Sequence, residues 1–223
     1  MTPKLKLLLI GILFALSALV YLVLSFWGGA AANRDFEPLV KRAKAGLENT
    51  SQAQALCQDA AKKLPKVLSE IEASGEKIPP NPSGNTLDEK TTTMLKSGYK
   101  ALAQCQMKLK QFEAAVSSYQ TLVDLDPQEG YRHGDLASAL SKINRHNEAM
   151  RSALLAIQLN PNVWQAHRTY GQVLEAAGQT PAALNAYQQA ANYAPPNEKE
   201  NANKVISRLK ESLSAIPTKT GAP

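Results

Sequence analysis

Apolar residues recur at helical spacing through most of the second half of the chain. One stripe runs through Leu136 and Leu140, and another runs through Ala115, Tyr119 and Leu122. Residues three and four positions apart share one face of a helix, so each stripe predicts an amphipathic helix that buries that face. The stripes come in pairs separated by short turns. This arrangement predicts a series of helix hairpins.

Three prolines mark the ends of these hairpins at a constant interval. Pro127, Pro161 and Pro195 are 34 residues apart along the chain. The residue before a proline avoids the helical conformation, so each proline marks the end of a helix. A hairpin of this length cannot bury a hydrophobic face alone, and units of one fixed length therefore stack on each other. If each proline is position 32 of its unit, the units are 96–129, 130–163 and 164–197.

Two columns of small residues support this alignment. Position 8 and position 20 of the three units hold alanine or glycine in every case, which lets the two helices of a hairpin approach closely. These residues are Ala103, Ala137, Gly171, Ala115, Ala149 and Ala183. The pattern resembles the tetratricopeptide repeat (TPR), which has small residues at positions 8 and 20 and proline at position 32. The resemblance implies an all-α fold, an α-solenoid of three TPR helix hairpins.

Residues after the third unit predict a capping helix, because a stack of repeats needs an end with one polar face. Apolar residues fall at helical spacing over 198–216, and 217–223 is expected to be a flexible tail. The apolar positions of this helix are Ala202, Val205, Ile206, Leu209, Leu213 and Ile216. Between the helices of a unit, Asn144 and Gly178 occupy one turn position, where a positive φ is tolerated.

The amino-terminal segment 1–32 predicts a membrane anchor. Residues 7–27 carry no charge and are nearly all apolar, a length that can span a bilayer as one transmembrane helix. A cleaved signal peptide, with its cleavage site among the alanines 30–32, is the rival interpretation. Basic residues flank the apolar stretch on both sides, so the positive-inside rule leaves the orientation open. We expect a single-pass protein of the bacterial inner membrane, with its soluble part in the periplasm.

The remaining segments complete the expected domain organisation. Residues 33–90 show no repeat register and predict a helical leader or spacer, in which Pro65 bends or divides a helix. An exposed loop is expected at 74–86, where proline, glycine and serine gather. The three repeats then occupy 91–197.

Charge and cysteine content exclude several partner classes. The formal net charge of +6 is spread thinly, without a basic stripe that could hold phosphates, so no nucleic-acid partner is expected.

Cys105 falls at a position where the later repeats carry apolar residues, which favours a buried thiol. Cys57 lies on a helix of the leader and can form a disulfide with Cys105 if the two helices meet. Two unlinked thiols are the favoured interpretation.

No catalytic motif is recognisable, and the protein is expected to be neither an enzyme nor a binder of cofactors or small-molecule substrates. One alternative from another class is a metal-dependent regulator or enzyme that uses Tyr99, His133 and His167. These residues share position 4 of the three repeats. A metal site would need further ligands, and packing between helices is the favoured role.

The first helices of stacked repeats form a concave surface, and the resemblance implies that partners bind there. The positions that face it in the family hold mainly basic and amide side chains, which predicts a groove for a peptide or helix of a partner protein. The expected groove residues are Lys100, Gln104, Lys108, Tyr131, Ser138, Lys142, Gln165, Arg168, Gln172 and Glu175. Some members of the family bind a terminal carboxylate of a chaperone, but Asp135 would repel a carboxylate at one of the matching positions.

The expected function is that of a membrane-anchored scaffold or adaptor that binds protein partners through this groove. Its layout resembles factors that assemble complexes of the bacterial envelope, such as those of cytochrome c maturation. The alternative within the same class is an accessory structural subunit of a larger membrane complex for secretion, pilus formation or photosynthesis. These roles rest on the layout of the chain alone.

Overall fold

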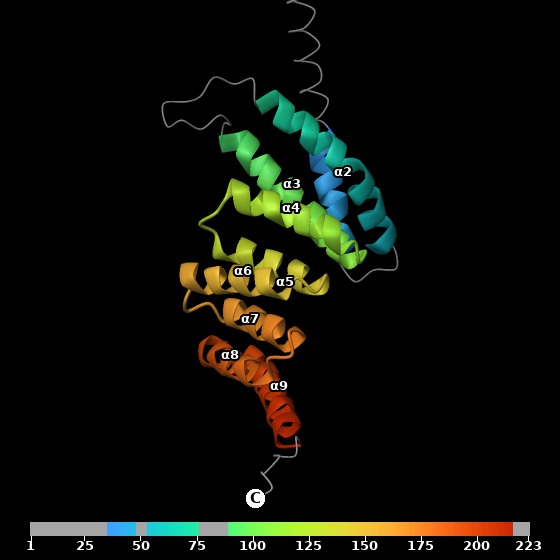
Figure 1. Ribbon diagram of the computed structural model, residues 1–223. Helices are drawn as coiled ribbons and strands as arrows, with labels where there is room; N and C mark the ends of the chain where they lie inside the picture. The colour runs from blue at the N-terminus through green and yellow to red at the C-terminus, as the bar shows by residue number, and fades with distance from the viewer. Residues whose placement is uncertain (1–34, 48–52, 76–88, 216–223) are drawn as a thin grey trace, which may run out of the picture. The chain divides into compact units, whose positions relative to one another are not determined.

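The computed structural model describes residues 35–47, 53–75 and 89–215, and all regular secondary structure in these residues is helical (Figure 1). The expectation of an all-helical, TPR-like solenoid is confirmed at this level. The chain divides into two compact units, residues 1–105 and residues 106–223. We describe each unit by itself.

The first unit brings together a helix over 35–47, α2 (Ala53–Gly75) and most of α3 (Glu89–Lys108). Its largest fully buried apolar side chains come from all three helices and are Phe36, Leu64, Leu68 and Leu95. Gly98 of α3 permits a close approach, because a Cβ there would lie 2.6 Å from a methyl of Leu68. Pro65 lies inside α2, which runs on without a break. Of the two predicted outcomes at Pro65, division of the helix is therefore wrong, and a bend stays a prediction.

A disulfide joins α2 to α3 within the first unit. Cys57 and Cys105 are fully buried, and their Cα atoms are 5.0 Å apart. The sequence analysis favoured two unlinked thiols, and the structure shows the bonded alternative. The Sγ atom of Cys105 also lies 3.5 Å from the carbonyl oxygen of Ala43, so all three helices of the unit meet at this point.

The second unit is a succession of antiparallel helices that follow the predicted repeats. Each helix packs against the next in sequence, and α5 also packs against α7, so that the helix pairs form successive layers (Figure 1). The helices are α4 (Phe112–Leu125), α5 (Gly130–Lys142), α6 (His146–Leu159), α7 (Trp164–Ala176), α8 (Thr180–Tyr193) and α9 (Pro196–Ser214). Because α5 and α7 are the first helices of successive repeats, their contact places two equivalent faces side by side.

The turns inside the repeats share one backbone geometry. Asn144 and Gly178 adopt positive φ values of 60° and 73°, at the turn position where the sequence indicated that such values are tolerated. Lys110 occupies the same turn position in the first predicted repeat and also has a φ of 60°. Glycine reaches this conformation without strain, whereas a lysine does not. The surrounding fold therefore forces this turn conformation on Lys110, which lysine does not favour by itself.

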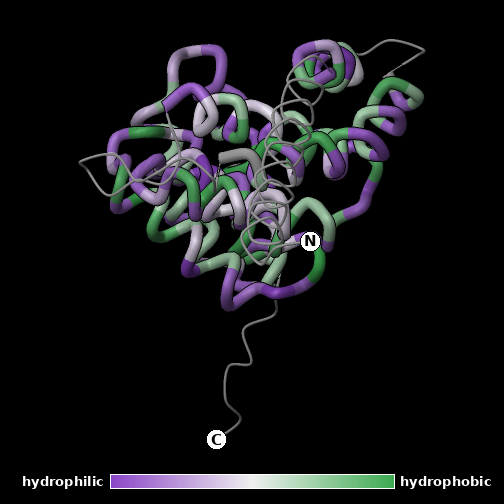
Figure 2. Tube along the Cα trace, turned by 90° about the horizontal axis from the view of Figure 1, so that it is seen from above, coloured by the Kyte–Doolittle hydropathy of each residue, from purple (hydrophilic) through white to green (hydrophobic). Residues whose placement is uncertain are grey.

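Small residues hold the repeats closely packed, as predicted. Ala115, Ala149 and Ala183 are fully buried. Gly171 lies under the aromatic ring of Tyr187, and a Cβ at this glycine would approach three ring atoms to 3.1–3.2 Å. Figure 2 shows apolar and polar residues alternating along the helices, as expected for helices that bury one face.

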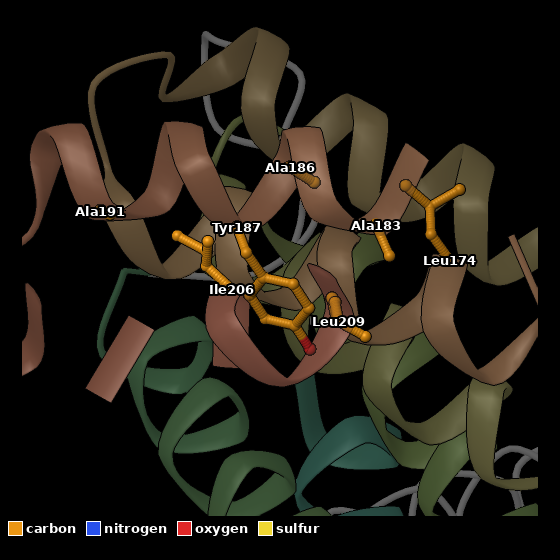
Figure 3. Close-up of a cluster of buried hydrophobic side chains, with 7 residues drawn as sticks. All are labelled: Leu174, Ala183, Ala186, Tyr187, Ala191, Ile206 and Leu209. Carbon is orange, nitrogen blue, oxygen red and sulfur yellow. The ribbon is translucent and has the colours of Figure 1, made fainter. Parts of the chain in front are cut away.

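The predicted capping helix is α9, whose bounds are Pro196–Ser214 rather than 198–216. Ile206 and Leu209 are buried and pack against residues of α7 and α8, including Tyr187 and Leu174 (Figure 3). Ile216, which was expected to continue this apolar stripe, lies outside the described residues. The segment thus closes the last hydrophobic layer of the unit.

The predicted localisation in a membrane has to be corrected, because the described helices do not support it. Within 35–47, 53–75 and 89–215, no helix is both long enough and apolar enough to cross a membrane. This finding contradicts the expected single-pass protein of the bacterial inner membrane. The stretch 7–27, on which that expectation depended, lies outside the described residues.

A groove along α5, α7 and α9

The first helices of successive repeats enclose a cavity of about 230 Å³ between α5 and α7. Five of the predicted groove residues line it. They are Tyr131, Ser138, Gln165, Arg168 and Gln172. Their side chains come from two helices that the sequence separates by a full hairpin, so the 34-residue repeat brings them together.

Two further cavities extend this surface from α7 to α9. The first, of about 730 Å³, is lined by Lys142, Glu175 and Arg208, among others. The second, of about 220 Å³, is lined by Trp164 of α7 and by residues of α9 that include Asn201. The three cavities share Ser138, Thr169, Arg168 and Gln172 between neighbours. We call this continuous surface the α5–α7–α9 groove.

Three of the predicted groove residues line none of these cavities. Lys100 and Gln104 belong to α3 in the first unit, where Lys100 is exposed and Gln104 is half-buried. Lys108 is the last residue of α3 and lines none of the three cavities of the α5–α7–α9 groove. The groove therefore unites seven of the predicted residues, all on α5 and α7.

The structure adds residues that the sequence analysis did not assign to the groove. Trp164 and Arg208 are the most informative, because each contacts a predicted groove residue. Trp164 precedes Arg168 by four positions on α7, a spacing that places them on one face of a helix. The contact between Trp164 and Arg168 could therefore have been predicted from their spacing in the sequence. Arg208 carried no such signal, because α9 does not follow the repeat register.

Arg168 is held by an aromatic ring rather than by an acid. The carbon at the centre of its guanidinium group lies 4.7 Å from the centre of the Trp164 ring. Its Nε atom is buried and has no hydrogen-bond partner in the described part of the chain. A stacked guanidinium keeps its N–H donors in one plane, where they remain able to bind a ligand.

The carboxylate of Glu175, in the cavity that Arg208 of α9 also lines, accepts hydrogen bonds from two side chains. The Tyr187 hydroxyl donates a hydrogen bond to one carboxylate oxygen at 3.1 Å, and Arg208 donates to the other at 2.7 Å. Burial, followed by the negative charge of Glu175, raises the pKa of the Tyr187 hydroxyl above its ordinary range. This network connects α7, α8 and α9 and fixes the wall of the groove.

The residues proposed for a metal site have other roles. The Nε2 atoms of His133 and His167 lie 2.8 Å from the carbonyl oxygens of Pro127 and Pro161, respectively. Because a carbonyl only accepts, each Nε2 carries the proton and donates it. The two histidines thus connect the first helix of a repeat to the proline that closes the preceding repeat.

Tyr99 and His167 have further contacts. The Tyr99 hydroxyl donates to a carboxylate oxygen of Glu72 at 2.7 Å, and the His167 ring stacks on Tyr193 with the ring centres 5.3 Å apart. In the part of the chain that the structure describes, no group of three or more histidine, cysteine, aspartate or glutamate residues is placed to hold a metal ion. These residues hold the helices to each other.

Comparison with known proteins supports the repeat that the sequence predicts. Residues 98–129 and 133–163 match the tetratricopeptide repeat model. The match supports the TPR family, and it covers the first two of the three predicted units. The finer prediction of a bacterial, membrane-anchored member is not supported.

A curated relative shows the same kind of repeat. The small glutamine-rich tetratricopeptide repeat-containing protein 2 of Mycosarcoma maydis is 29% identical to this chain over 116 residues. The alignment covers 52% of this chain and 32% of the relative. The aligned segment therefore spans about a third of the length of this relative.

Solved structures share the helical fold. The crystal structure of MamA resembles this chain with a TM-score of 0.54 and 20% identity, and the similarity covers 73% of this chain and 82% of MamA. The Sgt2 TPR domain from Aspergillus fumigatus gives a TM-score of 0.50 with 18% identity, covering 66% of this chain and 90% of that domain. At these identities the likeness concerns the fold alone.

Proposed function

We propose that the α5–α7–α9 groove binds an extended segment of a partner protein, and that the chain acts as a scaffold or adaptor. The observation that carries the proposal is the convergence of seven predicted residues from two repeats on one continuous groove. Stacked helical repeats use such surfaces to bind peptides. The tetratricopeptide match supports a role in protein interaction.

The chemistry of the groove suits a peptide backbone. Gln165 and Gln172 each offer an amide with both donors and an acceptor, and Ser138 adds a hydroxyl. An extended peptide needs such partners, because its own N–H and C=O groups are not paired with each other. Tyr131 is 52% exposed and lines the same cavity, so its ring is available for an apolar contact.

The narrower role in the assembly of a membrane complex is not part of this proposal. It depended on the apolar stretch 7–27, and no described residue supports it. The role of an accessory subunit in a larger complex would use the same groove, and the same experiment tests it.

The test removes groove contacts without changing charge. We expect the double variant Tyr131→Ala/Gln172→Ala to recover far less partner protein than the wild type after crosslinking in the native cell. The matched control is Leu155→Ala/Gln158→Ala on α6, which also removes one large apolar residue and one glutamine. Both control residues are exposed and line none of the three cavities.

Circular dichroism and the melting temperature of each variant show whether the fold is retained. All four positions are at least partly exposed or polar, so we expect the helical content to stay unchanged. Equal recovery of partners by the groove variant and the control variant would contradict the proposed function.

A further inference from the structure

Resting on the proposed function, we propose that Arg168 is the point of the groove that binds a carboxylate. The partner segment then carries an aspartate or glutamate side chain that seats on the Arg168 guanidinium. The neighbouring amides and Tyr131 bind the residues on either side. This inference names the chemistry of the ligand, which the proposed function leaves open.

The stack on Trp164 prepares Arg168 for this role. The indole lies against one face of the guanidinium, with its ring centre 4.7 Å from the central carbon. A guanidinium held in this way loses little freedom when it binds, and its planar fork matches the two oxygens of a carboxylate. Binding to a preorganised group is stronger than binding to a mobile lysine of the same charge.

The unpaired Nε of Arg168 is a second and independent observation. Buried polar atoms in proteins nearly always have a hydrogen-bond partner, so each exception requires an explanation. In the described residues three such side-chain atoms occur, in Arg132, His146 and Arg168. Arg132 faces the carboxylate of Asp126 at 3.7 Å. Of the three, only Arg168 lines the α5–α7–α9 groove, and because its Nε is shielded from solvent, a carboxylate in the groove would bind the terminal nitrogens of the guanidinium.

The charges next to Arg168 limit the ligand to a single acidic group at that point. Arg208, the cation of α9 that lines the groove, is already paired with Glu175 at 2.7 Å. Lys142 is a further cation, but it lines a cavity that Arg168 does not line. Glu198 lines the cavity on the α9 side of Arg168 and would repel a second carboxylate there. We therefore expect one acidic residue flanked by neutral or basic residues, rather than a run of acids.

A carboxylate can come from a side chain or from the end of a chain. Arg168 lines both the cavity next to α5 and the smaller cavity next to α9, so groove surface continues on either side of it. A segment that passes through the groove would place a side chain there. This continuity favours an internal aspartate or glutamate, and peptides with an amidated end distinguish the two sources.

The experiment selects peptides from a random library displayed on phage, using the full-length protein as bait. Parallel selections use Arg168→Gln and the control Arg151→Gln. Arg151 is an exposed cation of α6 that lines none of the three groove cavities. We expect one aligned acidic position in the peptides selected by the wild type and by Arg151→Gln. We expect this position to lose its acidic preference with Arg168→Gln.

Synthetic versions of the selected peptide then give affinities by calorimetry. Replacing its acidic residue by the matching amide should weaken binding to the wild type by roughly tenfold to a hundredfold, the usual effect of losing a charged hydrogen bond. The same replacement should have little effect on binding to Arg168→Gln. Amidation of the peptide end should leave the affinity unchanged.

Each outcome separates this inference from the proposed function. If the wild type selects no peptide, the proposed function itself fails. If it selects peptides without an acidic position, or if Arg168→Gln keeps the acidic preference, the groove remains a binding surface and the role of Arg168 is refuted. If only the amidated peptides lose affinity, the ligand is a chain end. Should Arg168→Gln fail to fold, the replacement in the peptide still tests the inference on the wild type.

Discussion

In the described part of residues 35–105, three helices are held by a few large side chains and one covalent bond, whereas residues 106–215 bury a small residue at one recurring position of each repeat. Phe36, Leu64 and the disulfide between Cys57 and Cys105 illustrate the first kind. Ala149 and Ala183, at the same place in successive repeats, illustrate the second. The stabilising contacts of the first unit are concentrated in a few large residues and the disulfide, whereas those of the second unit are distributed over successive repeats.

This difference explains where a binding surface can form. Alanine and glycine contacts bring the helices of each repeat close together, so that Gly171 lies directly under Tyr187. The polar faces of α5 and α7 then remain available and line the groove. A regular stack thus provides equivalent positions along one surface, which is the property that repeat proteins use for binding.

The largest effect should come from removing the disulfide. It closes a loop of 48 residues, and by the chain-entropy relation its loss costs the first unit about 4 kcal/mol. We expect Cys105→Ala to accelerate hydrogen exchange throughout α2 and α3 while leaving α7 and α8 unchanged. Reduction of the wild type is the control and should have the same effect. Equal protection of α2 with and without the bond would contradict this account of the first unit.

The next effect tests the close packing of the second unit. In Gly171→Ala the new Cβ would meet the Tyr187 ring at 3.1 Å, and such overpacking costs about 1–3 kcal/mol. Gly134→Ala is the matched control, because a Cβ there meets no atom within 4 Å. Since alanine favours a helix over glycine, the control should gain up to about 1 kcal/mol. Urea unfolding of both variants measures the difference, and a stable Gly171→Ala protein would argue against close packing.

A smaller effect depends on pH and involves the same tyrosine. The pKa of Tyr187 is raised above its ordinary value of 10.0 in the folded chain, chiefly by burial. The unfolded chain therefore releases this proton first, and the stability of the folded state falls as the pH rises above about 10. We expect Tyr187→Phe to show a flatter decline in melting temperature at alkaline pH. Because burial also raises the pKa of Tyr119, some decline should remain.

The smallest effect concerns the turn that begins the second unit. Lys110 has a φ of 60°, a conformation that glycine adopts freely. Lys110→Gly should therefore raise the free energy of unfolding by about 0.5–1 kcal/mol. The equivalent change in reverse, Gly178→Ala, should lower it by about 1–2 kcal/mol. Melting temperatures of both variants provide the measurement, and a destabilised Lys110→Gly would show that the turn is not strained.

Features that repeat along the chain could be predicted from the sequence. The hairpins, the small residues at Ala149 and Ala183, and the positive φ of Asn144 and Gly178 all depend on residues within one repeat or its neighbour. Seven of the ten residues expected from the same register line the groove cavities, and their binding of a partner stays a prediction. Periodic patterns carry this information because the same local geometry recurs at each position.

The remaining features depend on contacts that no period describes. Whether Cys57 bonds to Cys105 is decided by how α2 meets α3, and α2 has no place in the repeat register. The pair between Arg208 and Glu175 requires the position of α9 on the last repeat. Lys110 is a different case, because the repeat register placed it at the turn position of Asn144 and Gly178 although lysine itself has no preference for positive φ. The predicted localisation was inferred from the stretch 7–27. It was wrong, because no helix in the described residues is long and apolar enough to cross a membrane.

Photo-crosslinking from single positions tests the central claim, that the α5–α7–α9 groove is the binding surface, most directly. A photoreactive amino acid replaces Gln172, which is exposed in the groove, or Gln189, which is exposed on α8 and lines none of its three cavities. We predict that irradiation of cells attaches partner proteins to the protein labelled at Gln172 and not to the one labelled at Gln189. Attachment at Gln189 alone, or equally at both positions, would contradict the claim.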